Sequence, residues 1–311
     1  MTIPETSPDG YPYRVVDVFT DRPLEGNSLA VFPHALGLGD ATMRNIAREL
    51  NLSETVFVFP AMRSDCAARI RIFTPSREMD FAGHPSIGAS FVLLDEGIVP
   101  KNSASFVLEE NIGPVAIRVE QGARPLIWLT TPAIEFGPTF DRALCAGALG
   151  LSPEDLAHPE PQRLSAGNPT IFVALKDKEA VDRAWLDMSG MKKLKVTDQD
   201  PACVFVFAAT PQGAYSRMFA PEYGIVEDPA TGSSTGPLAA YMIRHNLVSG
   251  RAGNRFVSEQ GTKMRRRSLL HVHVRGERGV DGIEVGGHVT PLVRAVMQLE
   301  IDASREGTWG S

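Results

Sequence analysis

The chain contains one sequence pattern twice, and this repeat restricts the possible fold more than any other feature. Residues 71–75 (RIFTP) lead into 81–89 (FAGHPSIGA), and residues 217–221 (RMFAP) lead into 229–237 (PATGSSTGP). Each copy reads Arg-x-Phe-x-Pro, then a loop, then a glycine at the start of a helical run. Two copies of one unit predict two similar domains in the same chain.

A second pair of segments supports this division and helps to place the domain boundary. Residues 26–32 (GNSLAVF) are echoed by residues 167–173 (GNPTIFV). Residues 121–125 (QGARP) lack apolar periodicity and are the best candidate for a linker. We therefore predict an N-terminal half at 1–123 and a C-terminal half at 124–311, whose last strand could pack on the N-terminal half.

The two glycine-containing loops predict sites for an anion. Gly83 and Gly232 have no side chain to keep a ligand away from the unpaired N–H groups at a helix start. Such a start attracts a carboxylate or a phosphate, although a plain helix cap explains either loop as well. If the two helix starts face each other, their partial positive charges add on one bound carboxylate.

Two ionisable residues are candidates for chemistry in the N-terminal half. Glu54 precedes the strongly apolar run Thr55-Val56-Phe57-Val58-Phe59. A carboxylate beside apolar surface can act as a general acid or base near neutral pH, because its charged form is disfavoured. His84 follows Gly83 at a helix start, where a neutral imidazole can donate or accept a hydrogen bond. A solvated glutamate at a strand end and a histidine that caps its helix remain the alternatives.

Composition excludes several classes of protein. The 311 residues carry a formal net charge of −6, with one short basic run at 265–267, and this gives little support to nucleic-acid binding. Cys66, Cys145 and Cys203 are odd in number and widely spread, so neither a disulfide framework nor a zinc site fits them. We expect a cytoplasmic protein, without a signal peptide or a membrane-spanning stretch.

Periodicity gives a coarse secondary structure. We expect a helix capped by Asp40, and a helix over 177–187 with Val181, Ala184 and Trp185 on its buried face. His271 and His273 alternate onto one strand face, but no third ligand stands nearby, so we expect no metal. The strands expected in the C-terminal half are 126–130, 203–208, 215–219, 255–260, 269–274, 282–285 and 295–300.

Four motifs in this order resemble the PhzF-like (phenazine biosynthesis) family. They are residues 16–20 (VDVFT) with Gly26-Asn27, residues 52–55 (LSET), residues 81–85 (FAGHP) and residues 227–233 (EDPATGS). The resemblance covers nearly the whole chain and implies an α+β fold like that of diaminopimelate epimerase. In that fold two similar halves each wrap a mixed, largely antiparallel sheet around a central helix, with the active site between the halves.

The resemblance also implies roles for individual residues. Glu54 matches the family's catalytic glutamate, while His84, Asp228 and Ser233 match its substrate-contacting residues. Gly83 and Gly232 match its backbone donors. The racemases of this fold carry two cysteines at the helix starts, where this chain has Ala82 and, on the closest alignment, Pro229. Two-thiol racemisation is therefore excluded, and a proton shuttle by one carboxylate remains.

The function implied is a cofactor-free isomerase of a small carboxylate-bearing substrate, similar to trans-2,3-dihydro-3-hydroxyanthranilate isomerase. Glu54 would move the proton, and the resemblance adds a homodimer. One alternative is a dehydratase or epimerase of a hydroxy amino acid, in which His84 protonates a leaving hydroxyl. The other is a binding protein that keeps the fold without catalysis.

Overall fold

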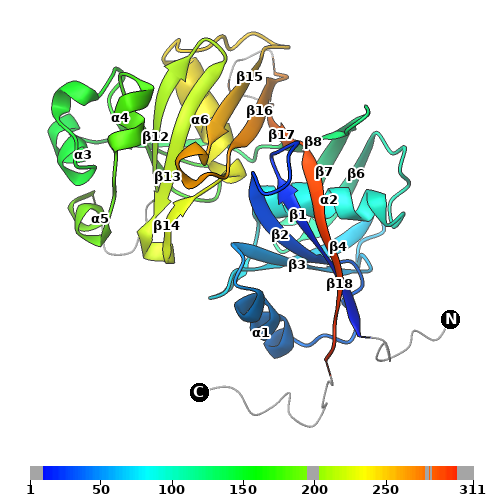
Figure 1. The fold of residues 1–311 in the computed structure, drawn as a ribbon. Coiled ribbons are helices and arrows are strands. Elements are labelled where there is room, and N and C mark those ends of the chain that lie inside the picture. Colours follow the sequence, from blue (N-terminus) through cyan, green and yellow to red (C-terminus); the bar gives the residue numbers. More distant parts are fainter. Residues whose placement is uncertain (1–9, 195–202, 277–279, 281, 300–311) are drawn as a thin grey trace. The chain divides into compact units, whose positions relative to one another are not determined.

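The computed structural model describes residues 10–194, 203–276, 280 and 282–299, and these residues form two compact units (Figure 1). The first unit contains 10–24, 28–129 and 288–299. The second contains 25–27 and the described part of 130–287. The chain thus leaves the first unit after the segment ending at Leu129 and returns to it at His288.

The first unit is one mixed sheet with two helices, α1 (Asp40–Leu50) and α2 (Gly83–Asp95). Its strands are β1 (Tyr11–Val18), β2 (Asn27–Phe32), β3 (Glu54–Phe59), β4 (Ala68–Phe73), β5 (Glu78–Met79), β6 (Ser105–Glu110), β7 (Gly113–Glu120), β8 (Leu126–Thr130) and β18 (Val289–Met297). They pair in the order β18-β1-β2-β3-β4-β6-β7-β8, and β5 adds to β4.

The second unit repeats this arrangement with four helices, α3 (Arg142–Ala148), α4 (Lys178–Arg183), α5 (Met188–Leu194) and α6 (Gly232–Arg244). Its strands are β9 (Glu135–Thr139), β10 (Gln162–Ser165), β11 (Thr170–Ala174), β12 (Cys203–Thr210), β13 (Gly213–Ala220), β14 (Ile225–Asp228), β15 (Arg255–Gln260), β16 (Ser268–Val274) and β17 (Ile283–Gly287). They pair in the order β9-β10-β11-β12-β13-β15-β16-β17, and β14 adds to β13.

The two sheets have the same sequence of strand directions. Pairs β2–β3 and β11–β12 are parallel, as are β4–β6 and β13–β15. The pairs that lie between these parallel pairs in each sheet, β3–β4 and β12–β13, are antiparallel. The prediction of two similar halves from the repeated motif is therefore confirmed at the level of topology.

Each unit is built around one helix that the sheet buries on nearly every side. A Cβ atom added to Gly88 of α2 would lie 2.5 Å from Leu29 Cδ2 and 2.8 Å from Val18 Cγ2, so this helix packs directly on β1 and β2. In α6, Tyr241 packs against the rings of Phe172 and Phe207, at centroid distances of 6.1 and 5.9 Å. Apolar burial of this kind is the main stabilising term of each unit.

Three details of the secondary-structure prediction were wrong. Gly39 is the N-cap of α1, and Asp40 is its first residue. Helix α4 ends at Arg183, so helical spacing no longer applies to Trp185, which is 53% exposed. The last strand begins at Val289 and ends at Met297, whereas the predicted segment 295–300 reaches position 300, outside the described residues.

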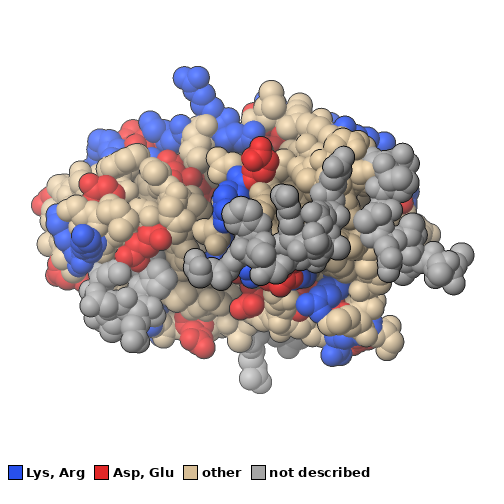
Figure 2. Space-filling model, turned by 90° about the horizontal axis from the view of Figure 1, so that it is seen from below, with Lys and Arg blue, Asp and Glu red and all other residues tan. Residues whose placement is uncertain are grey.

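The net charge of −6 is the small difference between 31 basic and 37 acidic residues. On the face shown in Figure 2, basic and acidic side chains are interspersed among the described residues, as the modest net charge leads one to expect. Within the described ranges no helix has both the length and the apolar character that crossing a membrane requires.

Candidate active site

Glu54 stands at the first position of β3, where the chain enters the buried sheet. Asn51 ends α1 in the left-handed conformation, with φ 49°, and so turns the chain toward this strand. Parallel pairing with β2 places Glu54 opposite Leu29. Its side chain is 13% exposed, so the alternative of a solvated glutamate at a strand end does not describe it.

His84 lies in the first turn of α2 and contacts Glu54. The distance between His84 Nε2 and Glu54 Oε2 is 3.3 Å, and the imidazole is 6% exposed. Burial lowers the pKa of His84 to about 3 because the charged ring would lose its hydration. The contact therefore joins a carboxyl group and a neutral imidazole at neutral pH. The N-cap of α2 is Ala82 rather than His84.

Gly83 is the first residue of α2 and follows the extended Ala82. The first N–H groups of a helix have no partner within the helix. The start of this helix, which carries Gly83 and His84, therefore combines backbone donors with the imidazole in the same unit as Glu54.

Asp228 ends β14 in the second unit and accepts hydrogen bonds from several neighbouring groups. Asn27 Nδ2 donates to its Oδ1 at 3.0 Å, and the Thr231 hydroxyl donates to its Oδ2. Gln260 Nε2 donates to its backbone carbonyl at 2.8 Å. Burial raises the pKa of Asp228 to about 6, and the hydrogen bonds from Thr231, Ala230 N–H and Asn27 offset part of that rise. Asp228 can therefore exchange a proton close to neutral pH.

Gly232 and Ser233 begin α6 directly after this loop. Thr231 is the N-cap, and its N–H donates to Gln260 Oε1 at 3.1 Å. Ser233 is half-buried, and its Oγ accepts from Asn168 Nδ2 at 3.5 Å. The start of α6 thus combines backbone donors, a hydroxyl group and the carboxyl group of Asp228 in one unit.

Superposing the two topologies strand by strand pairs residues of the two units. In the parallel pair β2–β3, Glu54 lies opposite Leu29. In the equivalent pair β11–β12, Cys203 lies opposite Thr170, so Cys203 takes the position of Glu54. When Gly83 is aligned with Gly232, His84 pairs with Ser233, Met79 with Asp228 and Ala82 with Thr231. The repeat therefore aligns Thr231, rather than Pro229, with Ala82. The two candidate sites share a scaffold but not their chemistry.

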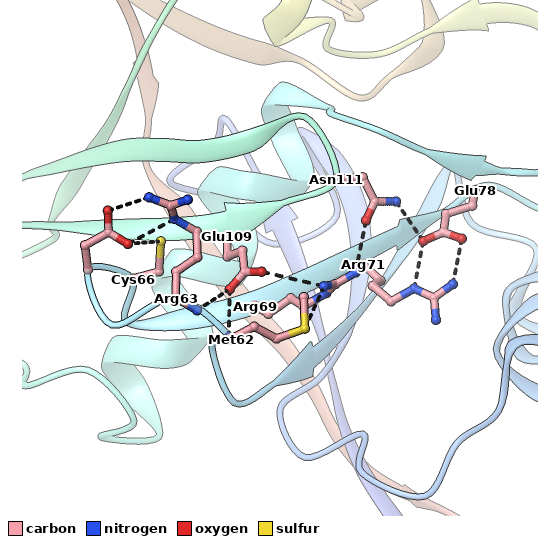
Figure 3. Close-up of polar contacts among 9 residues, drawn as sticks. Met62, Arg63, Cys66, Arg69, Arg71, Glu78, Glu109 and Asn111 are labelled. Carbon is pink, nitrogen blue, oxygen red and sulfur yellow. Dashed lines mark hydrogen bonds and ion pairs between the residues drawn. The ribbon is translucent and has the colours of Figure 1, made fainter.

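The arginine of the repeated Arg-x-Phe-x-Pro motif braces each loop. Arg71 forms a bidentate pair with Glu78 on β5, with Nε and Nη2 each 2.7 Å from an oxygen (Figure 3). Arg217 forms the same pair with Glu227 on β14, at 2.9 and 2.8 Å. Both glutamates stand five residues before the helix-start glycine, a spacing that could have identified them in the sequence.

None of the three cysteines lies at a helix start of α2 or α6. Cys66 is in the segment between β3 and β4, Cys145 is in α3, and Cys203 begins β12. Across the described ranges, no three side chains of His, Cys, Asp or Glu gather as metal ligands would. His273 instead contacts Glu284 at 3.1 Å.

Comparison with known proteins gives consistent matches. A family model described as phenazine biosynthesis-like protein matches residues 16–295. The trans-2,3-dihydro-3-hydroxyanthranilate isomerase of Pseudomonas chlororaphis is 34% identical over 294 residues, which cover 92% of this chain and 99% of that protein.

Solved structures match over the same length. A PhzF-family phenazine biosynthesis protein from Bacillus anthracis has a TM-score of 0.83 at 24% identity and covers 93% of this chain and 99% of its own. A probable proline racemase from Agrobacterium radiobacter has a TM-score of 0.61 at 16% identity, with 93% of each chain covered. The diaminopimelate epimerase-like fold expected from the sequence is confirmed.

Proposed function

The chain belongs to the phenazine biosynthesis-like protein family and is an isomerase of that type, and we propose that Glu54 moves a proton within a small carboxylate-bearing substrate. The proposed reaction needs no cofactor. A substrate similar to trans-2,3-dihydro-3-hydroxyanthranilate is the first candidate, because this compound names the reaction of the Pseudomonas chlororaphis relative.

The observation that carries the proposal is the contact between Glu54 and His84. Glu54 is a largely buried carboxyl group that lies 3.3 Å from a neutral imidazole and is shielded from most of the bulk water. A general base must be positioned in this way to take a proton from carbon in a defined geometry.

In the proposed step, the Glu54 carboxylate takes a proton from one carbon of the substrate. The electron pair of that C–H bond moves into the conjugated system, and the resulting carboxylic acid returns the same proton to another carbon. Atoms and electrons balance without an oxidant or a metal. The product is an isomer of the substrate.

The substrate carboxylate would be bound by the helix starts at Gly83 and Gly232, with Ser233 as a further donor. Fixed backbone donors at a helix start stabilise negative charge as it develops during the reaction. Asp228 and His84 would hold an amino or hydroxyl group. Because the pKa of Asp228 is raised to about 6, this residue can accept a proton from such a group or return one to it.

The neutral state of His84 weakens the dehydratase alternative. To protonate a leaving hydroxyl near pH 7, a side chain must carry at that pH a proton that it can readily give up. Burial lowers the pKa of His84 to about 3, so its ring does not carry the extra proton at that pH. The homodimer and the cytoplasmic location stay predictions.

Replacing Glu54 by glutamine tests the proposal. The amide keeps the shape of the side chain but cannot shuttle a proton, so turnover should fall by about 10²–10⁴-fold or more. Product formation from trans-2,3-dihydro-3-hydroxyanthranilate can be followed by absorbance. In D₂O, NMR locates deuterium at the new C–H bond whenever the shuttled proton exchanges with solvent.

Glu49→Gln is the matched control, because Glu49 is an exposed acid on α1 in the same unit. This variant should retain the activity of the wild type. If Glu54→Gln keeps activity within a few-fold of the wild type while its fold is intact, Glu54 is not the proton carrier and the proposed mechanism is wrong.

A further inference from the structure

A second glutamate, Glu110 at the end of β6, is buried in the first unit and takes no part in the proposed proton transfer. It is 4% exposed, and its Oε1 lies 2.6 Å from the hydroxyl of Ser86 in the first turn of α2. The same hydroxyl lies 2.7 Å from the carbonyl oxygen of Ala82, the N-cap of that helix. Glu110 is thus joined through one hydroxyl to the turn that carries Gly83 and His84.

The hydrogen-bond inventory favours the neutral acid at this position. The Glu110 Oε2 atom is buried and has no hydrogen-bond partner among the described residues. As a carboxylate, Glu110 would therefore receive one hydrogen bond, from Ser86, although a carboxylate can accept about four. As an acid it donates to Ser86 Oγ, which in turn donates to the Ala82 carbonyl. Burial raises the pKa of Glu110 to about 8, and the Ser86 hydrogen bond offsets part of that rise.

The second unit has an uncharged side chain at the corresponding position. Pairing of β4 with β6 sets Arg69 against Glu109, and pairing of β13 with β15 sets Tyr215 against Glu259. The next residue in each strand is Glu110 in one unit and Gln260 in the other.

A hydroxyl-to-carbonyl hydrogen bond is present in the first turn of both helices, although Glu110 reaches α2 through Ser86 and Gln260 contacts the N-cap of α6 directly. Thr235 Oγ1 donates to the Thr231 carbonyl at 3.0 Å, as Ser86 Oγ does to Ala82. Gln260 braces the N-cap of α6 by accepting from Thr231 N–H at 3.1 Å and donating to Thr231 Oγ1 at 3.0 Å. A protonated glutamate offers one donor and one acceptor, as an amide side chain does.

We infer that Glu110, as the neutral acid, is a positioning residue that fixes the first turn of α2, and with it Gly83 and His84, as Gln260 fixes the start of α6. This inference rests on the proposed function only where it concerns turnover. Ionisation of Glu110 would remove the hydrogen bond that it donates to Ser86. It would also leave a buried negative charge with few hydrogen bonds next to the first turn of α2.

Charged groups around Glu110 do not change this reasoning. The elements around β6 carry several ionisable side chains, among them Glu54 on β3, Arg69 and Arg71 on β4, Asp80 in the loop before α2, His84 and Asp95 on α2, Glu109 on β6, and Arg118 and Glu120 on β7. Glu109 points to the opposite face of its strand and contacts Arg69 at 3.6 Å, as Figure 3 illustrates. Asp80 is exposed, and His84 is neutral.

The pH dependence of stability tests the neutral acid without any activity assay. Because the folded-state pKa of Glu110 is raised, the wild type loses stability relative to Glu110→Gln as pH rises from about 5 to about 8. The Tm difference between Glu110→Gln and the wild type should grow over this range and then stay constant. Glu49→Gln, an exposed control, should show no such trend. A Tm difference for Glu110→Gln that is flat from pH 5 to 9 would overturn the inference.

A second experiment tests positioning, through NMR of the histidine ring nitrogens at pH 6.5. Glu110→Ala should shift or broaden the His84 signals and lower kcat by roughly 10- to 100-fold, because a small displacement of a catalytic group is costly. Glu110→Gln should restore the His84 signals and most of that kcat. Unchanged His84 signals in Glu110→Ala would refute positioning, whether or not the wild type turns over the proposed substrate. A wild type that is inactive while the His84 signals respond as expected would refute the proposed function alone.

Discussion

The repeated arginine offers a prediction in which the two units serve as controls for each other. Arg217 and Glu227 are 5% and 9% exposed, and Arg217 Nη1 also donates to the carbonyl of Ala184 at 2.6 Å. Replacing Arg217 by methionine keeps most of the apolar stem, but it removes the guanidinium group, whose carbon lies 4.8 Å from the centroid of the Phe219 ring, and leaves the Glu227 carboxylate buried without its cation. Breaking a buried ion pair on one side costs about 3–5 kcal/mol of unfolding free energy.

The equivalent change in the first unit should cost less. Arg71 and Glu78 are 17% and 20% exposed, and Asn111 Nδ2 still donates to Glu78 at 2.9 Å when the arginine is gone. Water and this amide can stabilise the remaining carboxylate. The expected loss for Arg71→Met is about 1–2 kcal/mol, between the values for exposed and buried pairs.

Urea denaturation followed by circular dichroism measures both losses, and hydrogen exchange at β4 and β13 assigns each loss to its unit. The double variant Arg217→Met/Glu227→Leu should recover part of the stability, because it removes the unpaired charge. Equal losses in Arg217→Met and Arg71→Met would refute the reasoning that burial sets the strength of this brace.

Further predictions concern Asp228, the packing of the central helix α2 and a glycine of α3. Because burial raises the pKa of Asp228 to about 6, the wild type should lose stability relative to Asp228→Asn as pH rises from about 4 to about 6; a Tm difference independent of pH in that range would contradict this. Gly88→Ala should destabilise the protein by about 1–3 kcal/mol, since its new methyl group would meet Leu29 Cδ2 at 2.5 Å. Gly147→Ala, in α3 with nothing within 4 Å of the new Cβ, should instead stabilise by about 0.5–1 kcal/mol. Thermal or urea unfolding distinguishes these signs, and a neutral Gly88→Ala would show that the helix has room at this position.

Sequence patterns predicted the elements that local chemistry determines. The start of β3 at Glu54 and the starts of α2 and α6 at Gly83 and Gly232 follow from a polar corner or a glycine beside an apolar run. The repeat of Arg71 and its neighbours predicted the duplication, because the same strand-loop-helix unit needs the same residues twice.

Other features depend on contacts between distant segments and have no local signal. The 3.3 Å contact of His84 with Glu54 requires the packing of α2 on the sheet. Glu110 is separated in the sequence from the start of α2 by that whole helix and the loop after it, and Gln260 is separated from the start of α6 in the same way. Only the pairing of the strands reveals their roles. Trp185 is a case in which a local signal was present but misleading. Its spacing from Val181 is that of a helix, but α4 ends at Arg183.

The return of the chain to the first unit has a consequence for synthesis on the ribosome. Strand β1 pairs with β18 over its whole length, from Tyr11 with Met297 to Val18 with Val289. Nearly all of the second unit is translated between these two strands. The second unit can therefore finish folding first, while β1 keeps an open edge until the last strand emerges. Such an edge invites pairing with another nascent chain, so this protein is most exposed to misassembly in the interval before β18 emerges.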